Sequence, residues 1–344
     1  MKKITQFFCL ITVLLFLGGC DKDFVEVNTD PFAINKIDPA LLFAGAQRVG
    51  THGRHESENT IVQHFVNPFN EGATKAFNFN ADIDLFQTSP FSLYTGPIKA
   101  YVHILDLLEG TTTLVNLQSM VRIMKAFCFM VIVDHYGDVP YFNAGLAAIE
   151  GETAFFPEYD DDSGIYENLY TEISEAIANL NPAGDFVSAD LFYGFHAYIP
   201  VNSTAVQVEK WKKLGNSLLL RLGMRYSKAN PDKAQQIVSE AFNGGVMTSN
   251  DDNAFVTYDG TLYTNGANNG LIDNNPRFYY AAEPLVNQLK KTQDPRTKYL
   301  IALFANPGDP LGDENPNHNL DDMFGVPVGV EATSLGNPPY RGTR

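Results

Sequence analysis

The stretch LVNLQSMVRIMKAFCFMVIVDHYGDVP, residues 114–140, decides the fold class. Its apolar residues lie on nearly every side of a helix, a pattern typical of a helix that is buried on all faces. Gly137 and Pro140 follow the last apolar turn, where we expect them to end the helix. We therefore predict a central helix around which the rest of the domain packs.

Further helices are predicted on both sides of this stretch. Asp38-Pro39 indicates a helix start, because proline suits the first turn, and Pro97 indicates that another helix begins near that residue. A succession of helices of similar length indicates antiparallel pairs in an all-α, tetratricopeptide-like helical-repeat scaffold, although no clean repeat of about 34 residues is present. The predicted helices begin near residues 39, 97, 160, 208, 230, 283 and 295, and long loops are expected between about 250 and 277.

The N-terminus has the pattern of a bacterial export signal. Lys2 and Lys3 precede an apolar run that ends at Leu17, and this run is too short for a spanning helix of about 20 residues. Gly18-Gly19 lies directly before Cys20, which is the arrangement of a lipobox with Cys20 lipidated, and a plain secretory signal is the alternative. We expect a lipoprotein signal peptide at 1–19, a lipidated tether at 20–35 and a helical domain at 36–344.

Composition limits the possible classes of partner. The chain has 24 basic and 40 acidic residues, a formal net charge of −16, and loss of the two signal lysines would bring it near −18. The electrostatic field of this negative charge repels phosphate backbones, so we expect no nucleic-acid partner. After processing, only Cys128 would remain within the domain, so the fold has no internal disulfide and depends on its core.

Motifs for cofactors and metals are not present in the sequence. There is no Gly-x-Ser-x-Gly motif, phosphate-binding loop or dinucleotide-binding turn, so no cofactor is expected. His52, His55, Glu56 and His64 lack the spacing of a zinc hydrolase. The oxygen donors between 313 and 321 lack the glycine and glutamate of a calcium loop. We interpret both groups as solvated surface and expect no metal site, with calcium at the second group as the alternative.

Several stretches together resemble SusD/RagB-type proteins. MKAFCFMVIVDHYGDVPYFNAG (124–145) is similar to their buried helix and Tyr-Gly-Asp-x-Pro-Tyr turn, and EKWKKLGNSLLLRLGMR (209–225) is similar to a later helix. The remaining matches follow in the family's order: VNTDPFAINKIDPALLFAGAQ (27–47), YDDDSGIYENLYTEISEAIANL (159–180), DPR (294–296) and GVPVG (325–329).

The resemblance implies a lipid-anchored outer-membrane protein that faces the exterior. Such a protein captures glycan or another nutrient and passes it to a SusC-like TonB-dependent transporter without catalysis. Two departures are visible: family members usually run longer, which implies an incomplete C-terminus, and FHAYIPVNSTAVQ (195–207) is inserted before a helix. A surface lipoprotein glycoside hydrolase with two loop carboxylates and a structural adhesin on helical repeats remain alternative functions.

Ligand contact is expected in the loops, because aromatic rings beside amides and carboxylates suit the apolar faces and hydroxyls of sugars. The alternative for each ring is that it pins its loop to the helices below. We interpret Trp211 as a core residue and the Tyr136–Tyr141 turn as structural. The candidate ligand-binding residues are Tyr193, Phe195, Tyr198, Tyr258, Tyr263 and Asn265.

Overall fold

The computed structural model describes residues 37–50, 59, 61–66, 91–258, 280–301, 321 and 323–330. By its internal contacts the chain divides into two units, Met1–Asp38 and Pro39–Arg344. Nearly all of the first unit, including Cys20, lies outside the described residues. The boundaries of the signal peptide and tether therefore stay predictions.

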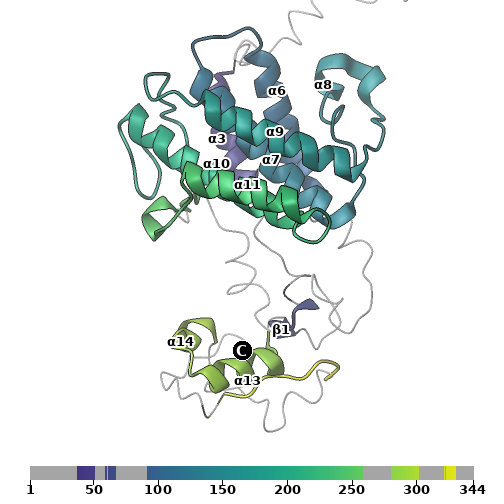
Figure 1. Cartoon of the computed structure of the whole chain (residues 1–344), viewed down its shortest axis with the longest axis vertical. Coiled ribbons are helices and arrows are strands. Elements are labelled where there is room, and N and C mark those ends of the chain that lie inside the picture. Colours follow the sequence, from purple (N-terminus) through teal and green to yellow (C-terminus); the bar gives the residue numbers. More distant parts are fainter. Residues whose placement is uncertain are drawn as a thin grey trace, which may run out of the picture. The chain divides into compact units, whose positions relative to one another are not determined.

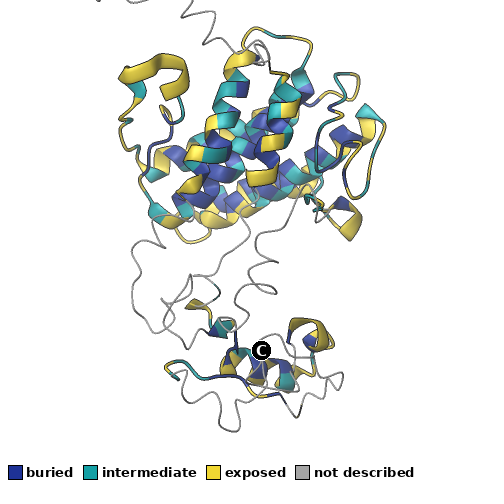
Figure 2. Ribbon diagram, turned by 180° about the vertical axis from the view of Figure 1, so that it is seen from behind, coloured by how far each residue is buried: buried dark blue, intermediate teal, exposed yellow. Residues whose placement is uncertain are grey.

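The centre of the helical part is α7, Val115–Tyr136. Its buried residues face every direction around the helix, as the apolar pattern predicted, and Figure 2 shows the buried residues gathered in the middle of the helical part. By length and composition α7 could cross a membrane, but 72% of its most apolar window is buried inside the protein. This burial identifies α7 as a core helix of the bundle.

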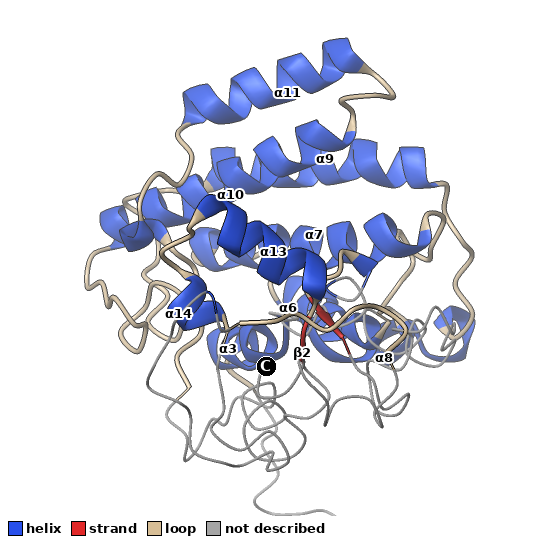
Figure 3. Cartoon of the chain, turned by 90° about the horizontal axis from the view of Figure 1, so that it is seen from below, coloured by secondary structure: helices blue, strands red, loops and turns tan. Residues whose placement is uncertain are grey.

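Other helices surround α7 in sequential pairs, and the all-α fold is confirmed (Figures 1 and 3). Helix α6 contacts α3 and α7, α9 lies against α7 and α10, and α10 packs along α11. A π-helical turn containing Pro97, η2, leads directly into α6. The bounds are α3 Pro39–Gly50, η2 Tyr94–Ile98, α6 Lys99–Leu107, α9 Asp162–Asn179, α10 Thr204–Arg225 and α11 Pro231–Gly244.

The short elements differ more from expectation. The predicted helix at 295–304 is seen only as α14, Thr297–Leu300, and the residues after 301 lie outside the described part. Two strands that the sequence did not predict, β1 (Phe65–Val66) and β2 (Tyr280–Ala281), pair in antiparallel register. The remaining bounds are α8 Ala147–Glu150, η3 Gly151–Ala154, η4 Asn250–Asp252 and α13 Glu283–Thr292.

Local side-chain contacts explain where the long helices begin. The carboxylate of Asp161 accepts hydrogen bonds from the backbone N–H groups of Ser163 and Gly164 at the start of α9. Asn230 accepts from the N–H of Lys233 at the start of α11, with Pro231 as the first residue of the helix. Both side chains satisfy backbone donors that have no partner within the helix.

The Tyr136–Tyr141 turn follows α7 and is held by hydrogen bonds to the segment at the start of α9. Gly137 has φ of +70°, a backbone conformation that favours glycine. Asp138 Oδ1 accepts from the N–H of Asp162 at 3.0 Å, and Asp160 Oδ2 accepts from the N–H of Tyr141 at 2.8 Å. These contacts are structural, because each carboxylate satisfies backbone donors of the neighbouring segment.

A buried carboxylate, Asp190, connects α3 to α10. It accepts hydrogen bonds from Gln47 Nε2 of α3 at 2.8 Å and from Trp211 Nε1 of α10 at 2.7 Å. All three side chains are buried, so the prediction that Trp211 lies in the core is confirmed. Burial raises the pKa of Asp190, and the bonds from Gln47 and Trp211 oppose that rise.

We predict that Gly137→Ala lowers the free energy of unfolding by about 1–2 kcal/mol, because a Cβ is disfavoured at positive φ. An added Cβ would meet no atom closer than Asp162 Oδ2 at 4.0 Å, so the cost comes from the backbone and not from a clash. Urea denaturation followed by fluorescence of Trp211, the only tryptophan, measures the change.

Gly164→Ala is the matched control, because this glycine lies in α9 with no atom near an added Cβ. It should be neutral or slightly stabilising, since alanine favours a helix. Equal stability of the Gly137→Ala variant and the unmodified protein would contradict the assigned role of Gly137.

Candidate functional site

Three of the predicted ligand residues, Tyr193, Phe195 and Tyr198, lie in a tight loop before α10. The N–H of Gly194 donates to the carbonyl of Asp190 at 2.9 Å. A Cβ at residue 194 would lie 2.3 Å from that carbonyl oxygen, so only glycine permits this close approach. Asp190, whose side chain connects α3 to α10, therefore also holds this loop through its backbone carbonyl.

Tyr193 does not display its ring to solvent, which corrects its prediction as a ligand contact. Its side chain is 1% exposed, and its ring lies edge-on to Trp211 with centroids 6.0 Å apart. Its hydroxyl donates to the carbonyl of Asp252 at 2.7 Å. Tyr193 therefore pins the loop to the core, the alternative that the sequence had left open.

Phe195 and Tyr198 are 53% and 67% exposed, as ligand contacts would need to be. The ring of Phe195 lies 4.9 Å from that of Phe186, and the ring of Tyr198 lies 4.9 Å from that of Phe255. These partners support the rings from one side. Tyr258 is partly buried, and Tyr263 and Asn265 lie outside the described residues.

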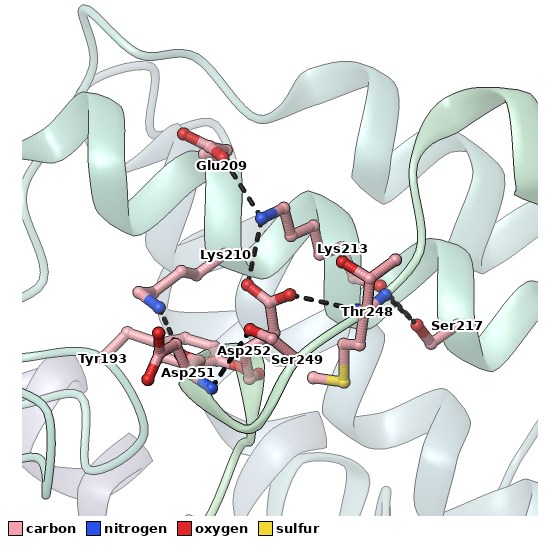
Figure 4. Close-up of polar contacts among 10 residues, drawn as sticks. Tyr193, Glu209, Lys210, Lys213, Ser217, Thr248, Ser249, Asp251 and Asp252 are labelled. Carbon is pink, nitrogen blue, oxygen red and sulfur yellow. Dashed lines mark hydrogen bonds and ion pairs between the residues drawn. The ribbon is translucent and has the colours of Figure 1, made fainter.

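A polar network holds the loop that carries Phe255 and Tyr258 against α10 (Figure 4). Asp252 Oδ1 pairs with Lys213 Nζ at 3.0 Å, and its Oδ2 accepts from the N–H of Thr248 at 3.1 Å. The Thr248 N–H and the Lys213 ammonium hold the pKa of Asp252 below its usual range. We call Thr248, Asp252 and Lys213 the loop anchor.

A second candidate region includes the segment that lies between α7 and α9 in the sequence. The sequence analysis did not single it out. A pocket of about 780 Å³ lies between the start of α6 and the segment 144–159, which we call the flap. Ligand sites in proteins commonly enclose about 300–1,000 Å³. The described lining residues are Phe91, Tyr94, Thr95, Lys99, Pro140, Ala144, Gly145, Ala147, Ala148, Ala154, Phe155, Phe156, Pro157 and Tyr159.

Two aromatic groups border this pocket. On the helical side Phe91 and Tyr94 have ring centroids 5.0 Å apart, and the Tyr94 hydroxyl donates to the carbonyl of Pro140 at 2.7 Å. On the flap Phe155, Phe156 and Tyr159 are all exposed, and Phe156 is 92% exposed. The sequence feature that could have indicated this pocket is the pair of adjacent phenylalanines before Pro157, which lies in a segment without helical periodicity.

One group of acidic side chains lies near the turn at the end of α7. Carboxylate oxygens of Asp138, Asp161 and Asp162 lie within 4.8 Å of one another, and all three residues are exposed. Asp138 and Asp161 already accept backbone N–H groups at the start of α9. Their role in beginning the helix accounts for their proximity.

Comparison with known proteins identifies the family. A family model described as SusD-like, starch-binding associating with outer membrane, matches residues 31–334. The chain belongs to this SusD-like family. No match was found among curated proteins.

Solved structures share the SusD-like fold. The chain is similar to a chitin-binding protein at 26% identity and a TM-score of 0.71, covering 89% of this chain and 63% of that one. A SusD homolog from Bacteroides uniformis has 22% identity and a TM-score of 0.65, covering 90% and 61%. A SusD/RagB family protein from Bacteroides thetaiotaomicron has 20% identity and a TM-score of 0.64, covering 86% and 60%. This chain thus spans about three fifths of the length of these structures.

We predict that Asp252→Asn loosens the loop anchor, because the neutral amide keeps the shape but loses the charge-assisted bonds. Hydrogen exchange of the Thr248 amide at pH 7 should become about tenfold faster. The pKa of Asp252 is lower in the folded state than in the unfolded chain. Its contribution is therefore present above pH about 4 and is lost as the pH falls through the lowered value.

The control is Asp251→Asn, because this neighbouring residue is exposed and offers only its backbone carbonyl to Lys210. Its exchange rates should match those of the unmodified protein. The anchor assignment fails if the two variants exchange alike at pH 7.

Proposed function

We propose that this protein binds glycan at the outer face of the outer membrane and passes it to a SusC-like TonB-dependent transporter. Membership of the SusD-like family over residues 31–334 is the observation that carries this proposal. The family description names starch binding and association with the outer membrane, and a similar structure is named a chitin-binding protein. Starch-type and chitin-type oligosaccharides are therefore the first ligands to test.

The loops before and after α10 supply the proposed glycan surface. Tyr198 and Phe195 present exposed rings that are backed by Phe255 and Phe186, so little ordering is needed when a sugar stacks on them. Tyr258, Tyr263 and Asn265 follow in the second loop and remain proposed contacts. The loop anchor supports this surface by holding the start of that loop on α10.

Binding without catalysis is part of the same proposal. A protein that passes its ligand on needs release more than tight capture, and two stacked rings with a few hydrogen bonds give millimolar to micromolar affinity in order of magnitude. Exposed loop carboxylates do not by themselves indicate a glycosidase, because a glycosidase needs two of them at a set separation across a sugar.

We predict that Tyr198→Ala weakens oligosaccharide binding about 2- to 10-fold, the loss expected for one aromatic contact. Calorimetric titration with maltooligosaccharides and chitooligosaccharides measures the change. Tyr170→Ala is a control on α9, because that ring lies beside Lys233 on another part of the helical bundle. Absence of saturable binding to any oligosaccharide in the panel would reject the glycan proposal.

The same samples test catalysis. Incubation with each bound oligosaccharide should leave it intact, as judged by chromatography of the products. Steady release of shorter sugars by the purified protein, abolished by a loop-carboxylate variant, would replace the binding proposal with the hydrolase alternative.

Lipid attachment at Cys20 is proposed from the sequence alone, since this residue lies outside the described part. We predict that labelled palmitate enters the unmodified protein and not Cys20→Ala, and that the variant leaves the membrane fraction. Several buried acyl chains anchor stably, because each methylene contributes about 0.8 kcal/mol. Labelling of Cys20→Ala at the same level as the unmodified protein would contradict this assignment.

A further inference from the structure

The aromatic pocket beneath the flap has a lining unlike that of a sugar site. Among the described residues that border it there is no carboxylate, asparagine or glutamine side chain. The Tyr94 hydroxyl already donates to Pro140, and the Thr95 hydroxyl already donates to the carbonyl of Ser92 at 3.2 Å. The Tyr159 hydroxyl and the Lys99 ammonium are the other polar side-chain groups of the described lining, so a pyranose would find few partners for its hydroxyl groups, and unpaired hydroxyls oppose binding.

Apolar chemistry dominates the pocket instead. Phe91 and Tyr94 form one wall, and Phe155, Phe156 and Tyr159 stand on the flap, with alanines between them. Two aromatic sides favour a flat ring, which gains stacked or edge-to-face contacts. The exposure of Phe156, at 92%, leaves its apolar surface available to such a ligand.

The lining also contains a single cation among the described residues. Lys99, the first residue of α6, is exposed and forms no ion pair with any other part of the chain that the structure describes. In a chain with a formal net charge of −16, this ammonium is a local site of opposite sign for an anion. An exposed lysine can reach a ligand while keeping its apolar stem along the pocket.

We propose that the pocket beneath the flap binds a planar aromatic carboxylate, with its ring between Phe91 and Phe156 and its carboxylate near Lys99. This site is separate from the glycan surface around Tyr198, and its ligand class is different. The flap aromatics provide the hydrophobic contact and Lys99 provides the preference for an anion.

The test titrates the full chain carrying Cys20→Ala, which removes the proposed site of lipid attachment, with trans-cinnamate at pH 7. We expect one saturable site, weakened about 3- to 10-fold by Phe156→Ala and by Tyr159→Ala. Lys99→Gln should weaken binding to a similar extent and reduce its dependence on salt. Cinnamyl alcohol, which has the ring without the charge, should bind the unmodified chain about as weakly as cinnamate binds Lys99→Gln.

Matched controls lie elsewhere on the surface. Phe242 of α11 is 67% exposed, as is Tyr159, and Phe242→Ala should leave cinnamate binding unchanged. Lys228→Gln removes an exposed lysine outside the pocket and should likewise have no effect. Equal loss in the pocket variants and these controls would show nonspecific binding and overturn the proposal.

Three other results would also overturn it. One is no saturable binding of cinnamate, and another is dodecanoate binding more tightly than cinnamate with the same dependence on Phe156, which would indicate an acyl-chain site. The third is loss of maltooligosaccharide binding in Phe156→Ala with cinnamate unaffected, which would make the pocket part of the glycan surface. The Tyr198→Ala variant separates the two proposals, because it should weaken sugar binding and leave cinnamate binding intact.

Discussion

The hydrogen bonds to Asp190 are the constraint on which the arrangement of the helices and the loop depends. Four donors reach this fully buried carboxylate: the side chains of Gln47, Gln207 and Trp211, and the N–H of Phe192. Loss of donors to a buried carboxylate is strongly unfavourable, so a shift of α3 would cost the bond from Gln47 and a shift of α10 would cost those from Gln207 and Trp211. The network therefore selects one packing of α3 against α10. The N–H of Gly194 donates to the backbone carbonyl of Asp190. The same packing therefore also fixes the loop that presents Phe195 and Tyr198.

Sequence reasoning succeeded where one residue type has one structural consequence. Gly137 at positive φ, Asn230 before Pro231 and the apolar residues around α7 each act over a few neighbouring positions, so their patterns predicted the helices and their ends. The strands β1 and β2 were missed, because two-residue strands joined across more than 200 positions leave no local periodicity. The prediction for Tyr193 failed for a related reason: the partner of its hydroxyl, the Asp252 carbonyl, is 59 residues away.

The two candidate sites illustrate different uses of aromatic residues on the same scaffold. Around Tyr198 the rings are supported by other rings and by a loop tied to α10, so their positions are set by buried contacts. On the flap, Phe156 has almost no neighbours, and its ring gains contacts only when something else covers it. A core ring and a recognition ring look alike in a sequence, and the difference between them is the long-range packing that burial records.

The turn after α7 also bears on how this surface can diversify. Asp160 accepts from the N–H groups of Tyr141 and Phe142, so the chain leaves and re-enters the helical bundle at one point. The residues between Phe142 and Asp160 form a loop whose two ends are held together by these hydrogen bonds. Substitutions, insertions or deletions in its exposed part, which includes Phe156, would leave the registers of α7 and α9 untouched. Sequence changes there can alter the exposed surface of this loop without rebuilding the helical bundle that carries it.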